Sequence, residues 1–297
     1  MEEHRRIKKA IIPVAGLGTR MLPATKAVPK ELLPILDKPL IQYVIEEAAL
    51  GGIKEIILVT RSGKESIENH FDSNYELESL LRVSGKQKIL KKLPKKILKD
   101  ISIISIRQES PLGLGDAILT AKNILKKKEP FAVFLPDEFL LSNGKISDFE
   151  RMMINFSSSG NGQILSEKIK LDKVSSYGIL DIENKQLTST KSRVIKGIKE
   201  KPSEAKAPSN YRVVGRYILP YEVMDFIDKL KPGKDNEIQL TDALQNFLSL
   251  NENNIEATLS DSKIFDCGSL KGFLGANIAL ASQDKEMKKY LGRILQK

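Results

Sequence analysis

The sequence predicts a doubly wound α/β fold, and three observations lead to this prediction. Short apolar segments alternate with segments of helical periodicity through the first half of the chain. The apolar segments are hydrophobic throughout, which is typical of strands buried on both faces of a parallel sheet. Hydrophobic residues make up 41% and charged residues 29% of the 297 residues, so the chain can bury a globular core.

The first half is expected to contain four strands with helices between them. Gly51 follows an apolar periodic segment directly and marks the end of one of these helices. We expect strands over residues 8–14, 55–60, 101–106 and 131–135, and helices over 39–50, 64–71, 75–83 and 115–125. Ligands of such sheets bind at the carboxyl ends of the strands, so the loops after Val14, Ile106 and Leu135 are the expected binding region.

The second half is predicted to be mixed. Strands are expected over residues 163–169, 178–182, 194–199 and 212–219, and helices over 222–230, 240–248 and 270–281. The sequence shows no internal repeat, low-complexity tract or long linker. We therefore expect one continuous domain whose sheet extends into the second half.

Several classes of site and location are disfavoured by composition. Cys267 is the only cysteine, which excludes an intrachain disulfide and a cysteine-based zinc site. With only His4 and His70 as histidines, neither a histidine-rich metal site nor a histidine general base is expected. No apolar run approaches the roughly 18 residues of a membrane span, and no signal-peptide pattern is present, so we expect a cytoplasmic protein.

A formal net charge of +10 points to anionic partners, but much of the excess is local. Lysines recur through residues 86–99, at positions 86, 88, 91, 92, 95, 96 and 99, with Ile and Leu interleaved at helical spacing. The favoured interpretation is the solvated face of a surface helix, and a patch for nucleic acid or membrane is the alternative.

The segment that follows the first expected strand contains two closely spaced glycines, Gly16 and Gly18, and then Thr19 and Arg20. Such glycines allow backbone N–H groups to approach an anion, and the cations Arg20 and Lys30 suit a triphosphate. The segment is neither a Walker A loop nor a complete dinucleotide fingerprint. A tight structural turn with surface charges is the alternative interpretation.

Polar residues next to other expected strands are further candidates. Asp137 follows the strand at 131–135, and Asp266 lies in a short loop; each could bind Mg²⁺ or serve only as a turn or cap residue. Gln108 precedes a Gly-Leu-Gly turn and could read a base edge. Glu200 and the adjacent Lys201 could hold a sugar and its phosphate or be solvated charges.

Many of these segments together resemble the bacterial UTP–glucose-1-phosphate uridylyltransferase family. The similarity runs in order along nearly the whole chain, through residues 13–34, 37–43, 66–72, 107–108, 113–115, 135–137, 177–178, 200–202, 214–217, 237–242 and 266–268. The wider nucleotidyltransferase superfamily shares only the glycine loop and the two aspartates, so the resemblance is specific.

The resemblance implies a Rossmann-like mixed sheet of the nucleotidyltransferase type with a sugar-binding extension. It implies one domain over residues 1–297, with a nucleotide-binding part to about residue 160 and a sugar-binding part with the C-terminal helices over about 161–297. The implied site consists of Ala15, Gly16, Gly18, Thr19, Gln108 and Gly113 for the nucleotide, Arg20, Lys30 and Lys201 for phosphates and catalysis, Asp137 and Asp266 for Mg²⁺, and Gly178, Glu200 and Gly215 for glucose.

Two positions depart from the pattern of the family. Residue 116 is Asp where relatives often have His, and residue 138, directly after the implied metal-binding aspartate, is Glu. Both lie next to the implied nucleotide site and bear on affinity or selectivity. For base choice, the side-chain amide of Gln108 can flip, so we expect fixed backbone groups near Gly16 and Gly113 to select uracil over cytosine.

The implied reaction transfers the uridylyl group of UTP to glucose 1-phosphate and gives UDP-glucose and pyrophosphate. Its nucleophile is a phosphate oxygen that is already anionic at neutral pH, so no general base is needed. The alternatives are the same chemistry with another base or sugar phosphate, such as dTTP or galactose 1-phosphate, and a non-catalytic regulatory paralogue. We expect a homo-oligomer that binds neither nucleic acid nor a membrane.

Overall fold

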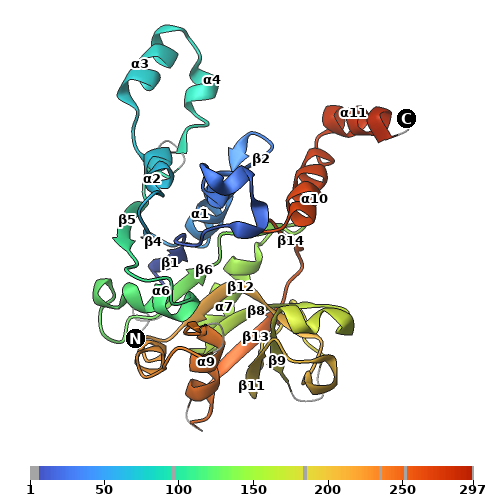
Figure 1. Ribbon diagram of the computed structural model, residues 1–297. Coiled ribbons are helices and arrows are strands. Elements are labelled where there is room, and N and C mark those ends of the chain that lie inside the picture. The colour runs from blue at the N-terminus through green and yellow to red at the C-terminus, as the bar shows by residue number, and fades with distance from the viewer. Residues whose placement is uncertain (1–6, 95–97, 183–185, 234–235, 251–252, 296–297) are drawn as a thin grey trace.

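The computed structural model describes residues 7–94, 98–182, 186–233, 236–250 and 253–295 (Figure 1). Three residues named above, His4, Lys95 and Lys96, lie outside these ranges. Within them, no helix is long and apolar enough to cross a membrane.

Across the described ranges, ten strands form one sheet at the centre of the molecule. Its main path runs in the order β10 (Arg193–Val194), β13 (Ile255–Leu259), β8 (Gly162–Lys168), β12 (Tyr211–Leu219), β6, β1, β4 and β5. The first half contributes four parallel strands, in which β1 pairs with both β4 and β6 and β5 completes the edge. These strands are β1 (Lys9–Pro13), β4 (Glu55–Thr60), β5 (Ser102–Arg107) and β6 (Phe131–Phe134), which confirms the predicted parallel α/β core.

Apolar side chains alternate between the two faces of these strands, as strand geometry requires. Ile11 of β1 belongs to a cluster on one face, whereas its neighbours Ala10 and Ile12 belong to a cluster on the other. The first face is covered by α6 (Leu114–Thr120), α8 (Val223–Asp228) and α9 (Leu240–Leu248), and the second by α1 (Leu40–Leu50), α2 (Glu65–Phe71) and α7 (Asp148–Ser159). The sheet is therefore buried on both faces, as a doubly wound fold predicts.

The second half of the chain extends this sheet. The long strand β12 (Tyr211–Leu219) pairs antiparallel with both β6 and β8 (Gly162–Lys168), and β13 (Ile255–Leu259) runs parallel to β8. A ribbon of β9 (Gly178–Asp181) and β11 (Gly197–Glu200) joins the sheet through β12. Strands of both halves thus share one sheet, while the predicted functional division near residue 160 stays a prediction.

Smaller elements lie beside the sheet (Figure 1). A two-stranded ribbon joins β7 (Glu138–Leu141) to β14 (Lys263–Asp266), and a second one joins β2 (Pro34–Ile35) to β3 (Lys38–Pro39). The helices α3 (Tyr75–Val83) and α4 (Gln87–Leu90) project from one side of the molecule. On the other side α10 (Leu270–Ala281) packs beside β14 and β2, and α11 (Lys285–Leu295) extends beyond it.

Two of the expected elements differ from those in the structure. The strand expected over residues 194–199 is divided into β10 (Arg193–Val194) and β11, because the chain changes partners there. The N–H of Ile195 bonds Ile255 of β13, whereas the N–H of Lys196 bonds Asp181 of β9. The helix expected over 115–125 ends at Thr120 and is followed by a separate 3₁₀ turn, Lys122–Ile124.

In its described part the lysine-rich segment includes the short helix α4. Leu90 is its buried residue, which fits an amphipathic surface helix. Lys92 is exposed and forms an ion pair with Asp37 at 3.1 Å. Part of this basic charge is therefore neutralised within the molecule.

Candidate active site

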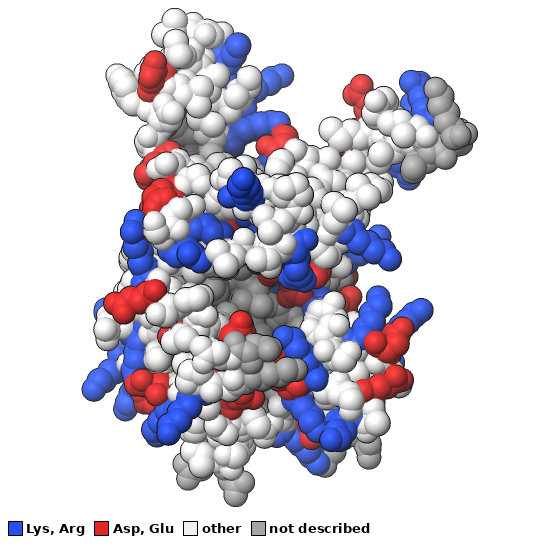
Figure 2. Space-filling view, viewed as in Figure 1, with Lys and Arg blue, Asp and Glu red and all other residues white. Residues whose placement is uncertain are grey.

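Two adjoining cavities open at the carboxyl ends of the central strands. The larger, about 590 Å³, is lined by the glycine loop after β1 and by the loops after β5 and β6. The smaller, about 240 Å³, lies over β9, β11 and β12. Arg20, Leu114, Leu135 and Asp137 line both cavities. The hollow between the upper and lower parts of the molecule is visible in the space-filling view, with acidic and basic side chains along its rim (Figure 2).

The glycine loop borders the larger cavity. Gly18 adopts a left-handed conformation, with φ of 70°, and its carbonyl accepts a hydrogen bond from the Thr25 hydroxyl at 2.8 Å. A side chain at Gly18 would be strained and would press against Thr25 and Lys30. Ala15, Gly16 and Thr19 also line this cavity, so the predicted nucleotide loop faces open space.

Four charged side chains gather where the two cavities meet. Lys30 Nζ lies 2.8 Å from Asp137 Oδ2, and Arg20 bridges the two aspartates, 3.0 Å from Asp266 Oδ2 and 3.6 Å from Asp137 Oδ2. Pairing of β14 with β7 places Asp266 opposite Glu138, and the N–H of Cys267 donates to the Asp137 carbonyl. The ribbon therefore brings together two carboxylates that are far apart in sequence.

This pairing changes the acidity of Asp137 and Lys30. Burial alone would raise the pKa of Asp137, but the charge and hydrogen bond of Lys30, with a smaller effect of Arg20, lower it below its ordinary value. Burial alone would lower the pKa of Lys30, but Asp137 outweighs it and raises the pKa. Both groups are therefore charged at neutral pH.

Gln108 and Gly113 line the larger cavity. Gly113 has a positive φ of 95°, and an added Cβ would come within 2.8 Å of the Glu237 Cβ. The side-chain amide of Gln108 donates to Asp116 Oδ2 at 2.6 Å. The predicted base-reading residues are thus brought together, and Asp116 contacts one of them.

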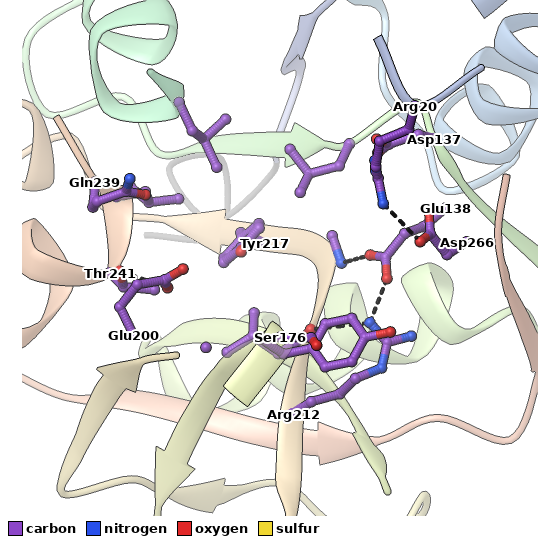
Figure 3. Close-up of a pocket in the computed structure, with 17 residues that line it drawn as sticks. Arg20, Asp137, Glu138, Ser176, Glu200, Arg212, Tyr217, Gln239, Thr241 and Asp266 are labelled. Carbon is purple, nitrogen blue, oxygen red and sulfur yellow. Dashed lines mark hydrogen bonds and ion pairs between the residues drawn. The ribbon is translucent and has the colours of Figure 1, made fainter. Parts of the chain in front are cut away.

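Residues from β9, β11, β12 and α9 surround the smaller cavity (Figure 3). Glu200 Oε2 accepts a hydrogen bond from the Thr241 hydroxyl at 3.0 Å beside Gly178. Gly215 has no room for a side chain, since a Cβ would lie 2.5 Å from the Leu135 Cβ. The three residues predicted for the sugar, Gly178, Glu200 and Gly215, all line this cavity.

A buried ion network supports the floor of the smaller cavity. Glu138 accepts a hydrogen bond from the Gly215 N–H and one from Arg212 Nη1 at 2.5 Å, and Arg212 also bonds Glu167 at 2.6 Å. The Arg212 guanidinium lies 4.5 Å from the centre of the Tyr177 ring. Glu138, noted above as a departure from the family pattern, therefore joins the backbone of β12 to the side chains that line the cavity.

Comparison with known proteins identifies the family. The profile of the nucleotidyl transferase family matches residues 9–283. The UTP–glucose-1-phosphate uridylyltransferase of Haemophilus influenzae is 42% identical over 284 residues, 95% of each chain. The chain belongs to the UTP–glucose-1-phosphate uridylyltransferase family. The same-named protein of Escherichia coli strain K12 is 42% identical over 277 residues, 91% of this chain and 89% of its own. The family expected from the motifs is thereby confirmed.

Solved structures give the same family. UDP-glucose pyrophosphorylase from Acinetobacter baumannii has a TM-score of 0.88 at 40% identity, covering 98% of this chain and 99% of its own. The UTP-bound form of the enzyme from that organism has a TM-score of 0.89 at 39% identity, with the same coverage. A UDP-glucose pyrophosphorylase complexed with UDP-glucose has a TM-score of 0.84 at 37% identity, covering 94% of this chain and all of its own.

Lys201 differs from the other predicted site residues in its position relative to the two cavities. It is not among the described residues lining either cavity, although its neighbour Glu200 is. Its side chain is 45% exposed and its Nζ lies 3.6 Å from Glu200 Oε1. Its backbone has a positive φ of 40°, and its N–H bonds the Tyr177 carbonyl at 3.0 Å.

Several lining residues were not singled out from the sequence. Glu237, Gln239 and Thr241 lie in a segment that resembles the family, so a signal for them was available. Arg212 gave no such signal, because a charged residue within an expected strand is ordinarily taken as solvent-facing. Here it is only 4% exposed and is held by two carboxylates.

Neither Cys267 nor His70 is placed for catalysis at the two cavities. Cys267 packs in a cluster with Ile35, Leu40 and Phe139, and burial raises the pKa of its thiol to about 12. His70 lies on α2, where its Nε2 is 2.9 Å from Gln42 Oε1. The described residues therefore place neither a thiolate nucleophile nor a histidine base at the cavities.

Asp137 and Asp266 have the donor chemistry for a divalent cation. Both are partly buried, and both reach the guanidinium of Arg20, so their carboxylates converge on one small region. Nowhere in the described ranges do three or more His, Cys, Asp or Glu side chains form a metal site. Two carboxylates suit Mg²⁺, which commonly takes one or two together with substrate phosphates. Enzymes of the nucleotidyltransferase family generally use a divalent metal.

Proposed function

We propose that this chain transfers the uridylyl group of UTP to glucose 1-phosphate, giving UDP-glucose and pyrophosphate. The observation that carries the proposal is the meeting of two cavities at Arg20 and Asp137. One cavity is bordered by a glycine loop suited to a nucleotide, and the other by hydroxyl and carboxylate groups suited to a sugar. The names of the UTP-bound and UDP-glucose-bound relatives support the same substrates.

The reaction joins two anions, so positioning and charge neutralisation dominate it. A phosphate oxygen of glucose 1-phosphate forms the new bond to the α-phosphorus of UTP. The bond from that phosphorus to the oxygen bridging it to the β-phosphorus breaks, and its electron pair leaves with pyrophosphate. No proton moves, which agrees with the absence of a histidine or thiolate from the described lining residues.

The cations divide between the two substrates. Lys30 and Arg20 lie beside the glycine loop and act on the triphosphate, and Lys201, next to Glu200, acts on the phosphate of the sugar. The glycine loop, Gln108 and Gly113 hold the nucleotide. Gly178, Glu200 and Gly215 hold the glucose.

Asp137 and Asp266 hold the metal, which is Mg²⁺. When bound, it neutralises charge on the phosphates. Arg20 is paired with both carboxylates and is 60% exposed, so its long side chain is free to move onto a phosphate when the substrates bind.

The test is pyrophosphate release across a grid of nucleoside triphosphates and sugar 1-phosphates with Mg²⁺. The highest kcat/KM is expected for UTP with glucose 1-phosphate. Asp137→Asn should abolish most of this release, and Asp100→Asn, which removes an exposed carboxylate elsewhere, is the matched control. A higher kcat/KM for dTTP or for galactose 1-phosphate would reassign the substrate. Release that is absent from the whole grid would favour the non-catalytic paralogue.

The homo-oligomeric state and the cytoplasmic location stay predictions from the sequence. Light scattering of the purified chain will give the number of subunits.

A further inference from the structure

Asp116 holds the side chain that is expected to read the base. Gln108 Nε2 lies 2.6 Å from Asp116 Oδ2 and makes a longer contact, 3.5 Å, with the Gly113 carbonyl. Gln108 lines the larger cavity, whereas Asp116 is not among its described lining residues. Asp116 is therefore placed to act on a nucleotide in this cavity through Gln108.

The two neighbours of Nε2 are both acceptors. An ionised carboxylate and a carbonyl accept hydrogen bonds and donate none. If the amide of Gln108 flipped, its oxygen would face both of them and lose both contacts. Asp116 therefore fixes the amide with its nitrogen toward the protein and leaves Oε1 available to the nucleotide.

The position of Asp116 is itself fixed by the fold. It lies in the first turn of α6, directly after Gly115. The Gly115 N–H donates to the Ile238 carbonyl at 2.8 Å, and a Cβ on Gly115 would lie only 2.7 Å from that oxygen. This close packing holds the start of α6 against the loop that carries Glu237. The backbone that carries the Asp116 carboxylate is thus packed against a neighbouring loop.

We propose that Asp116 is a positioning residue that makes Gln108 selective for a base with an N–H at N3. The proposal rests on the proposed function. Uracil carries such an N–H, which can donate to the fixed Oε1. The N3 of cytosine is an acceptor, so its lone pair would face a lone pair of Oε1 and the two atoms would repel each other. This proposal differs from the expectation that the Gln108 amide flips to suit either base. Because Asp116 prevents the flip, the Gln108 side chain itself distinguishes uracil from cytosine.

The first test is Asp116→Asn, which keeps the shape but can either donate or accept. Gln108 is then free to flip. The preference for UTP over CTP, measured as the ratio of dissociation constants by calorimetry and of kcat/KM values, should fall about tenfold, or about 1.4 kcal/mol. Affinity for UTP itself should change much less. An unchanged ratio would overturn the proposal.

The same substitution made in the Gln108→Ala protein distinguishes a positioning role of Asp116 from a general structural effect. In Gln108→Ala, Asp116 has no amide to orient. Adding Asp116→Asn should therefore leave the ratio of the UTP and CTP dissociation constants equal to that of Gln108→Ala alone. A further fall of the ratio in the double variant would show that Asp116 acts by another route and would refute the proposal.

An exchange variant gives a positive readout. Gln108→Glu places a carboxylate against Asp116 and should bind UTP poorly. In the double variant with Asp116→Asn, the amide introduced at position 116 donates to the carboxylate introduced at position 108. The other oxygen of that carboxylate remains available to accept a hydrogen bond from the base. UTP binding should recover at least several-fold relative to Gln108→Glu alone. No recovery, with both variants shown to be folded by their melting curves, would count against the proposal.

These measurements distinguish the two proposals. Failure of glucose 1-phosphate as a substrate would leave the ratio of UTP and CTP dissociation constants measurable, and Asp116 would still be tested. A wild-type protein that binds CTP as tightly as UTP would refute the role of Asp116 whatever sugar phosphate it uses.

Discussion

Replacing Lys30 with Gln should destabilise the free protein as well as slow its reaction. Lys30 and Asp137 are 2.8 Å apart, with side chains only 18% and 22% exposed. Gln retains a hydrogen-bond donor but removes the charge that keeps the carboxylate ionised. Because both side chains keep some contact with solvent, leaving the carboxylate without its partner should cost about 1–3 kcal/mol. For a chain of this size the melting temperature should fall by about 2–10 °C.

The stability difference between wild type and Lys30→Gln should depend on pH. The pKa of Asp137 is lowered in the folded state from its ordinary 3.8, so its contribution is present above pH 3.8 and is lost as pH falls through the folded value. The raised pKa of Lys30 keeps that group charged throughout this range. The difference should therefore be full at pH 7 and narrow below about pH 4.

Two variants serve as controls in calorimetric melting at pH 7 and at acidic pH. Lys26→Gln removes an exposed charge from the same segment and should change stability by less than about 0.5 kcal/mol. Arg20→Gln removes a side chain that is 60% exposed, so it should lower kcat while changing stability by about 0–1 kcal/mol. Equal melting temperatures for wild type and Lys30→Gln at pH 7 would refute the reasoning, as would a difference that stays undiminished in acid.

Three further outcomes are expected. Asp266→Asn should lower kcat by about 10²–10³-fold at saturating Mg²⁺, and wild-type turnover would remove Asp266 from the metal site. Lys201→Ala should raise KM for glucose 1-phosphate more than KM for UTP, so equal increases in steady-state assays would contradict the division of the cations. Cys267 should resist alkylation at pH 8 over hours, because burial raises its thiol pKa to about 12; rapid loss of activity with iodoacetamide would show that the thiol is accessible.

The parallel core was predictable because its strands are apolar throughout. Every expected strand of the first half has a counterpart in the structure, within about two residues at each end. The helix α7 was not predicted, although Ser147 and Glu150 form a capping box at its start and Phe149, Met152 and Phe156 follow at helical spacing. Its signal was present in the sequence and was missed.

Other elements could not be predicted, because tertiary partners decide them. The strand β14 is short and half-exposed, and only pairing with β7 makes it a strand. The helix α11 has a strongly amphipathic pattern but projects from the body, so its sequence gives no indication of what it packs against. The strands β7 and β13 were likewise not expected.

The cavity-lining residues were predictable to the extent that they follow strands in the first half. Asp137, Gln108 and the glycine loop lie at carboxyl ends of parallel strands, where the fold class places ligands. The support beneath them was not predictable. That Asp116 orients Gln108 and that Glu138 joins Arg212 to Gly215 depend on side-chain contacts between different elements.

The pairing of β14 with β7 also has a consequence for synthesis on the ribosome. Arg20 and Asp266 are 246 positions apart, and the ribbon that brings them together needs β14, which is made long after β7. The parallel strands β1, β4, β5 and β6 pair with one another, and all four are complete by residue 134, long before β14 is made. A nascent chain can therefore form its nucleotide loop and part of its core while it still lacks the second carboxylate. Catalytic competence should arise in one late step, after residue 266 has left the exit tunnel.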